Sequence, residues 1–237
     1  MRTTRAVFGA RTGTPTWGRK RAATAVLIAS LVVLAVAPAA NAGRPAIRGF
    51  LPPSARPHGY SLVDLATAYN QWLYGTPAES NPVLAGRCEP SPLDPKIWFL
   101  PVSLGGESEA TCEVPQGAFL VLTPGGWECS SIEPVPFFGS NEAELRECVD
   151  AGFDLLNYVE VTFNGETVTD LSAYVVTSRL DTLPPNNLLS SESGLTMNKG
   201  YFLVLHPLSP GTHTLRAYDE FEALGFVAGI TYTIIVG

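Results

Sequence analysis

Short apolar runs separated by turns rich in glycine and proline dominate the chain from residue 96 onward. Their lengths are typical of β-strands. We expect the second run to stop before Pro124, because proline cannot donate to a sheet and Gly125-Gly126 follows it. The apolar runs occupy residues 97–100, 118–122 and 201–205, and residues 174–180 are also strand-like. Residues 213–218 alternate, and residues 226–236 are rich in β-branched side chains.

Residues 159–163 alternate between apolar and polar side chains, which is the period of a strand with one buried face. Asn164-Gly165 follows, a strong signal for a hairpin turn, and residues 166–168 begin the return strand. No regular alternation of strands with helices is visible. The pattern therefore predicts a mainly β fold, an antiparallel β-sandwich that is jelly-roll-like or immunoglobulin-like.

Two segments have the period of amphipathic helices instead. The first begins at a capping box formed by Ser61 and Asp64 and ends at Gly75 and Pro77. The second spans about residues 141–156 and begins with an asparagine cap. We expect both helices to pack at the edge of the sandwich. The buried face of the first helix comprises Leu62, Leu65, Tyr69, Trp72 and Leu73.

The N-terminal region has the three parts of a secretory signal. A basic cluster at residues 19–21 precedes an apolar run over residues 22–37, and the small residues Ala40 and Ala42 flank Asn41. We place cleavage between Ala42 and Gly43, so residues 1–42 form the signal peptide. The alternative, a retained anchor, needs about 20 apolar residues to cross a bilayer, which is more than the run supplies.

The mature chain is predicted to contain a proline-rich leader over residues 43–59, extended and poorly packed, and a single β-sandwich domain over residues 60–237. The whole chain has a formal net charge of −7, but residues 1–42 carry no acid. Without them, 22 acidic residues face nine basic ones, a net charge of −13. This balance disfavours nucleic acid as a partner, and no second apolar run is long enough to span a membrane after cleavage. We expect a secreted or cell-surface protein.

All four cysteines lie in one window of the predicted mature chain. An even number of cysteines in an exported protein indicates disulfides, and the absence of a Cys-x-x-Cys pair disfavours a zinc site. Three pairings are possible. We favour Cys88–Cys112 and Cys129–Cys148, because loops between consecutive cysteines close at the lowest entropic cost.

Few side chains stand out as candidates for binding. Trp127, Glu128 and Glu133 lie close together around the third cysteine, and tryptophan beside carboxylates is common where sugars stack on aromatic rings. Trp72, on the first predicted helix, could line a groove with its aromatic neighbour, or both rings could pack the helix onto a sheet. Loop residues held by a disulfide are the alternative interpretation of the first group.

The densest acidic group comprises Asp219, Glu220 and Glu222. We interpret it as a solvated loop, because the chain has no calcium-loop motif. A nucleophile-elbow motif is also absent from the sequence. The sequence therefore indicates no catalytic residue, no metal site and no cofactor.

Several short motifs stand in a fixed order along nearly the whole mature chain. They are Gly86-x-Cys88, Trp98-Phe99-Leu100, Cys112-x-Val114-Pro115-x-Gly117 and Pro207-Leu208-Ser209-Pro210-Gly211-x-His213-Thr214. Together they resemble those of a family of exported bacterial and archaeal proteins of unknown function. The resemblance implies export and brings no activity, ligand or catalytic residue with it.

Three hypotheses about function follow. The first is a non-catalytic binding or cell-envelope-associated module, whose ligand is a polysaccharide or another envelope component and whose tryptophans form an exposed cluster. The second is a self-associating structural surface protein. The third is a hydrolase of extracellular polymers, which requires a cleft with two close carboxyl groups, one of them removed from water. The sequence favours a non-catalytic role.

Overall fold

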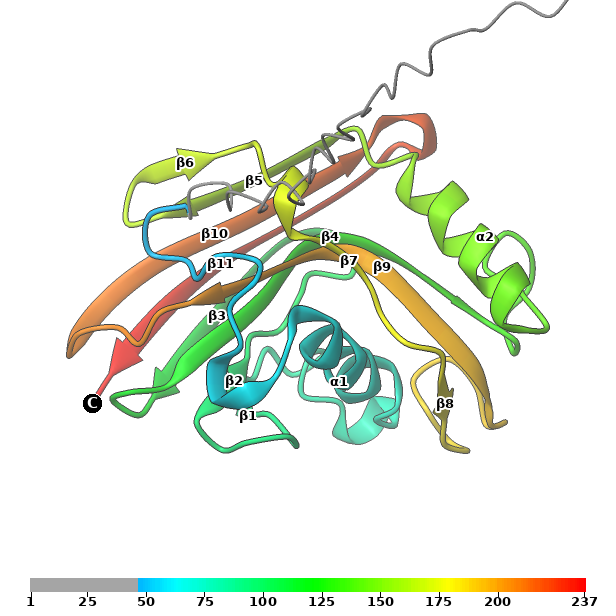
Figure 1. Cartoon of the computed structure of the whole chain (residues 1–237), viewed down its shortest axis with the longest axis horizontal. Coiled ribbons are helices and arrows are strands. Elements are labelled where there is room, and N and C mark those ends of the chain that lie inside the picture. The colour runs from blue at the N-terminus through cyan, green and yellow to red at the C-terminus, as the bar shows by residue number, and fades with distance from the viewer. Residues whose placement is uncertain (1–46) are drawn as a thin grey trace, which may run out of the picture. The chain divides into compact units, whose positions relative to one another are not determined.

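The computed structural model describes residues 47–237, which form two mixed β-sheets packed against each other together with two α-helices (Figure 1). The predicted β-sandwich is therefore confirmed. The predicted signal peptide and its cleavage site lie outside the described residues. No helix in the described part of the chain is long and apolar enough to cross a membrane.

The first sheet is built around a long antiparallel pair, β4 and β9. β2 joins the other side of β4 in parallel, β1 pairs with β2, and β7 and β8 pair with β9. The strands are β1 (Glu89–Pro90), β2 (Ile97–Phe99), β4 (Phe119–Ser130), β7 (Val175–Thr177), β8 (Asp181–Leu183) and β9 (Gly194–Leu205).

The second sheet has the order β3-β11-β10-β5-β6. The predicted hairpin at Asn164-Gly165 joins its last two strands. β3 runs parallel to β11, so each sheet contains one parallel pair that the local sequence pattern does not predict. The strands are β3 (Gly106–Val114), β5 (Tyr158–Phe163), β6 (Glu166–Val168), β10 (Gly211–Phe221) and β11 (Phe226–Val236).

Both predicted helices are present. The capping box of Ser61 and Asp64 begins α1 (Leu62–Tyr74), and Asn141 caps α2 (Glu142–Phe153) through the backbone N–H groups of Ala143 and Glu144. Four short 3₁₀ helices complete the structure: η1 (Pro57–Gly59), η2 (Ala78–Ser80), η3 (Ser172–Tyr174) and η4 (Glu222–Leu224).

The two helices pack on opposite faces of the β4–β9 pair. Asn70 of α1 donates from Nδ2 to Thr196 Oγ1, whereas Lys199 bonds to Asp150 of α2. Thr196 and Lys199 are an odd number of residues apart on β9, so their side chains leave the sheet on opposite sides. Figure 1 shows the same arrangement, with the two helices on either side of β9. Both faces of this end of the sheet are thus covered.

The expectation of a poorly packed leader is wrong for residues 47–59. Phe50 is 2% exposed, and its ring packs edge-on against Phe163 of β5. The backbone N–H of Leu51 donates to the carbonyl of Val204, which adds a further link to β9. A buried aromatic side chain and hydrogen bonds to Leu51 hold a proline-rich segment that composition alone assigns to solvent.

The expected end of the second strand at Pro124 is also wrong, because β4 continues to Ser130. The register between β4 and β9 shifts between Leu122 and Gly125, and this bulge accommodates the proline. A Cβ on Gly126 would meet the carbonyl oxygen of Lys199 at 3.0 Å, so glycine permits the strands to stay paired. The bulge therefore lets β4 continue past the proline to Ser130.

The two disulfides are those expected, Cys88–Cys112 and Cys129–Cys148. The first ties the segment before β1 to β3 of the other sheet, and the second ties β4 to α2. Each contributes about 2–4 kcal/mol in typical proteins. Both indicate an oxidising compartment.

Candidate functional site: an aromatic pocket lined by carboxyl groups

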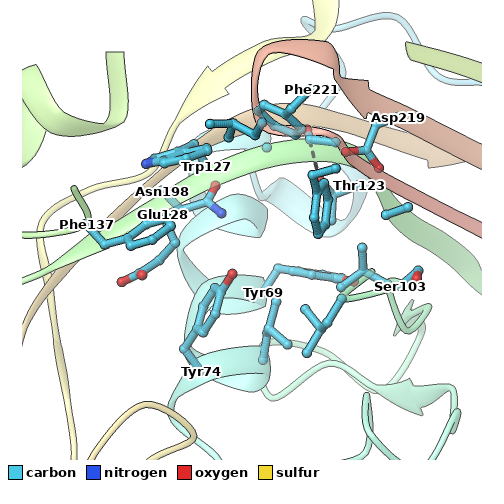
Figure 2. A pocket seen from close by; sticks show the side chains of 18 of the residues that line it. Tyr69, Tyr74, Ser103, Thr123, Trp127, Glu128, Phe137, Asn198, Asp219 and Phe221 are labelled. Atoms are coloured by element: carbon cyan, nitrogen blue, oxygen red, sulfur yellow. Dashed lines mark hydrogen bonds between the residues drawn. The ribbon is translucent and has the colours of Figure 1, made fainter. Parts of the chain in front are cut away.

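A pocket of about 400 Å³ lies between α1, the second half of β4 and the β10–β11 connection (Figure 2). The segment after β2 and the loop after β4 close its sides. No lysine, arginine or histidine occurs among its lining residues in the described part of the chain. Its walls are largely aromatic and include Tyr69, Tyr74, Trp127, Phe137, Phe221 and Phe226.

Gly125 and Gly126, next to the bulge in β4, line this pocket. A Cβ on Gly125 would lie 3.0 Å from the Cβ of Asp219 and 3.2 Å from a methyl of Leu156. The contact explains why the sequence needs a residue without a side chain here, beside an acidic residue from the second sheet. The glycine pair that we expected to end the strand is therefore part of the pocket wall.

Trp127 supplies an edge of the pocket and not a stacking platform. Phe137 stacks on its ring at 4.8 Å between centroids, with planes 16° apart. Gly152 of α2 lies so close to the ring that a Cβ there would overlap it. Stacking on one face and contact with α2 leave Trp127 8% exposed. Sugar stacking on an open tryptophan face is therefore not available at this residue.

Glu128 and Glu133 both line the pocket and interact with each other there. Glu128 is 6% exposed, and its Oε1 accepts from Thr196 Oγ1. The hydroxyl of Ser130 donates to Glu133 Oε2 at 2.9 Å. Burial, and then the hydrogen bond and charge of Glu133, raise the pKa of Glu128 well above its ordinary value. The Glu128 carboxyl therefore favours its protonated, neutral form more than an exposed glutamate does.

Asp219, on β10, lines a different part of the pocket. It is 5% exposed, and burial raises its pKa to about 7. Among residues 47–237 no side chain or backbone group bonds to this carboxyl. Its cross-strand neighbours, Val159 and Ala228, are apolar. The carboxyl therefore changes charge near neutral pH without a protein partner in either form.

Three further side-chain atoms are buried without a partner in the described structure, Asn70 Oδ1, Trp127 Nε1 and Asn198 Oδ1, and the last two belong to residues that line the pocket. Asn198 lies directly across the β4–β9 pair from Glu128, so both side chains project from the same face. Figure 2 shows its amide reaching into the pocket between Glu128 and Tyr69. The Asn198 amide oxygen is thus an acceptor that nothing in the described fold satisfies, and it is enclosed behind the pocket wall.

Tyr74, the last residue of α1, completes the acidic end of the pocket. Figure 2 shows its hydroxyl pointing inward. Burial, followed by the charges of Glu128 and Glu133, raises the pKa of this phenol above its ordinary value. The group therefore stays a neutral hydrogen-bond donor at physiological pH.

The structure brings three of the four predicted binding residues together: Trp127, Glu128 and Glu133 line one pocket. Trp72 does not lie there. It is 8% exposed and packs against Tyr69 and Phe99, and its indole N–H lies 3.5 Å from Glu89 Oε2. The expected cluster of exposed tryptophans is absent from the described residues. The candidate binding site is therefore the pocket and not a surface of exposed tryptophan rings.

Sequence reasoning missed Asp219, and the interpretation of its acidic group as a solvated loop is wrong for this residue. The inward positions of β10 are Leu215, Ala217, Asp219 and Phe221. The strand alternation that we recognised up to residue 218 continues to 221, and extending it would have placed the acid inside. Asn198 and Tyr74 were missed because no local pattern distinguishes them from ordinary strand and helix residues.

Within residues 47–237, no group of three or more histidine, cysteine or acidic side chains could hold a metal ion. No protein-family model, curated protein or solved structure matches the chain. The predicted resemblance to a family of exported proteins therefore stays a prediction, and the function rests on the pocket itself.

Proposed function

We propose that the chain is an exported, non-catalytic binding protein that takes a small ligand, or one group of a larger envelope component, into the aromatic pocket. The signal-peptide pattern and the two disulfides support export. A concave, largely aromatic pocket with a few converging polar groups is the usual form of a ligand site. The pocket volume of about 400 Å³ lies within the range of such sites.

The observation that carries this proposal is the set of buried polar groups left without protein partners. An unsatisfied buried acceptor such as Asn198 Oδ1 costs about 1–3 kcal/mol. The carboxyl of Asp219 also lacks a partner among the described residues, and its raised pKa is a cost to folding above neutral pH. Such costs concentrate at functional sites, where a ligand supplies the missing partners.

A thermal-unfolding screen of the secreted, disulfide-bonded protein tests this function. A library of small organic cations, anions and neutral molecules is added to the wild type and to two leucine variants. Leu224→Trp places a large ring at an exposed position of the pocket rim, and Leu155→Trp makes the same change at an exposed position outside it.

We expect at least one compound to raise the unfolding temperature of the wild type and of Leu155→Trp, but less that of Leu224→Trp. A library without effect, or shifts that Leu224→Trp leaves intact, would contradict the proposal.

The Glu128–Glu133 pair supports a second candidate, an acid hydrolase. Glycosidases separate their two carboxyl groups by about 5–10 Å. Here Glu128 and Glu133 line one pocket, and the interaction with Glu133 adds to burial in raising the pKa of Glu128, so that one acid of the pair is biased toward its protonated form. Such a pair can activate water with one group and protonate a carbonyl oxygen with the other.

Incubation with peptide and ester libraries between pH 3 and 7 tests this candidate, with Glu128→Gln as the inactive variant and Glu147→Gln on the exposed side of α2 as its control. Turnover lost only in Glu128→Gln would favour the hydrolase over the binding protein. Self-association, the remaining hypothesis, stays a prediction that sedimentation of the secreted protein tests.

A further inference from the structure

We propose that the ligand of this pocket is an organic cation, a protonated amine carried on an apolar body. The inference deepens the proposed binding function and rests on it. It is built from the sign of the groups that line the pocket, from the unpaired acceptor of Asn198 and from the aromatic walls.

The charges that line the pocket have one sign. Glu128 and Glu133 lie at one end and Asp219 lies apart from them, while no basic side chain contributes to the lining. A second anion brought into this low-dielectric space would meet only like charge, and a neutral ligand would leave the carboxyl groups uncompensated. An ammonium group is the partner that lets a buried carboxyl ionise.

Asn198 supplies an observation that does not depend on charge. Its side chain is 7% exposed, its Oδ1 has no hydrogen-bond partner among the described residues, and it projects into the pocket beside Glu128. Oδ1 is itself enclosed by the fold, and rotation of the amide about its terminal bond would turn this acceptor toward an N–H group of the ligand. A protonated primary amine has three N–H donors, enough for Asn198 and a carboxyl group at once.

The aromatic walls suit the rest of such a ligand. Tyr69, Tyr74, Phe221 and Phe226 provide ring surfaces around the carboxyl groups. Aromatic faces attract cations, and the attraction is largest where water is excluded. The rings can also bury the apolar part of the ligand. That burial supplies affinity, while the carboxyl groups of the pocket supply selectivity for a positive charge.

Binding of the cation is linked to loss of protons. The groups packed against Asp219 are Val159 on β5, Ala228 on β11 and Gly125 on β4, none of which titrates, and burial alone raises its pKa to about 7. The other titratable groups of the pocket are Glu128, Glu133, Tyr69 and Tyr74. Affinity for an amine should therefore rise with pH up to about 7, because below that pH the ligand must displace a proton from Asp219.

Calorimetry with three probes of matched size tests the proposal on the secreted full-length product at pH 8. The probes are 2-phenylethylammonium, its neutral counterpart 2-phenylethanol and the anion phenylacetate, with hexylammonium and hexanol as an aliphatic pair. We expect each ammonium to bind at least roughly tenfold more tightly than its alcohol, and phenylacetate not to bind.

Variants assign the effect to the pocket. Asp219→Asn should lose at least roughly tenfold in affinity for the ammonium and little for the alcohol, whereas Glu220→Gln, the next acid on the same strand, should change neither. Asn198→Leu should weaken 2-phenylethylammonium more than its trimethylated form, which has no N–H to donate.

The outcomes separate the inference from the proposed function. Equal binding of alcohol and ammonium, or a preference for phenylacetate, overturns the cation while leaving a binding pocket that Leu224→Trp blocks. Failure of every ammonium to bind overturns the cation as well. The proposed function falls only if the wider library also gives no shift that depends on Leu224.

Discussion

The two ends of the β4–β9 pair differ in how they treat buried polar groups. At one end Leu120, Val121 and Leu122 face Leu205, Val204 and Leu203, and nearby polar atoms are paired. The hydroxyl of Tyr69 donates to the Leu100 carbonyl at 2.6 Å, and that of Tyr232 donates to the Pro101 carbonyl at 2.6 Å. We call this the apolar end.

At the other end, the pocket end, the same two strands carry Trp127, Glu128, Asn198 and Thr196. Here three polar atoms, Asn70 Oδ1, Trp127 Nε1 and Asn198 Oδ1, are buried without partners in the described structure. Asp219 is a buried residue whose carboxyl accepts no hydrogen bond from the described residues. One strand pair thus contains a core whose polar atoms are hydrogen-bonded and, a few residues away, a site whose polar atoms lack partners. The difference teaches that the apolar end holds the fold together, while the pocket end carries groups that folding alone does not explain.

The largest loss of stability is expected when a buried side chain at the apolar end is shortened. Phe202 is fully buried against Tyr69, so Phe202→Ala should lower the free energy of unfolding by about 3–5 kcal/mol through lost burial and a cavity. Urea unfolding with the disulfides intact measures the change. Val135→Ala, at a highly exposed site, should shift it by less than about 0.5 kcal/mol. A small effect of Phe202→Ala would mean that this end is not the core.

At the pocket end, Asp219→Asn should stabilise the protein at high pH. The folded pKa of Asp219 is raised to about 7 from 3.8, so its ionisation costs stability progressively between pH 4 and 7 and fully above. The gain in Asp219→Asn should reach up to about 4 kcal/mol at pH 8 and vanish near pH 3. Unfolding free energies across this range, with Glu220→Gln as control, check the sign. A loss of stability at pH 8 would contradict the account.

Removal of the Cys129–Cys148 disulfide tests whether α2 positions the pocket end, because this bond joins β4 at that end to α2. The double change of both cysteines to alanine should lower the free energy of unfolding by about 2–4 kcal/mol. It should also weaken ligand binding, because Gly152 of α2 packs on Trp127. Loss of stability with undiminished binding would show that α2 does not position the pocket wall.

The smallest expected effect is that of Asn198→Leu. Replacing an unpaired buried acceptor with an apolar side chain of similar size should stabilise the ligand-free protein by about 1 kcal/mol. Thermal unfolding without ligand measures it. A destabilisation would indicate that the Asn198 amide contributes to the fold, and would weaken its assignment to a ligand.

Local signals in the sequence predict much of this fold. The caps at Ser61 and Asn141, the turn at Asn164-Gly165 and the β-branched run over residues 226–236 each specify their element through nearby residues alone. The disulfide pairing follows from loop lengths in the same way.

Features that depend on distant partners are not predicted. The parallel pairs β2–β4 and β3–β11 join segments whose pairing leaves no local signature. The bulge that carries β4 past Pro124 depends on the close approach of Gly126 to β9. The same limit applies to the pocket, because Asp219 and Asn198 become site residues only when β10, β4 and α1 meet.

The most direct test of the division between the two ends is the unfolding temperature of the wild type and Asp219→Asn at pH 8, each with and without saturating 2-phenylethylammonium. Without ligand, Asp219→Asn should be the more stable protein; with ligand, the wild type should gain much more, because only it can pair an ionised carboxyl with the ammonium. Equal ligand-induced gains in the two proteins, or a wild type that is already the more stable one without ligand, would contradict the account.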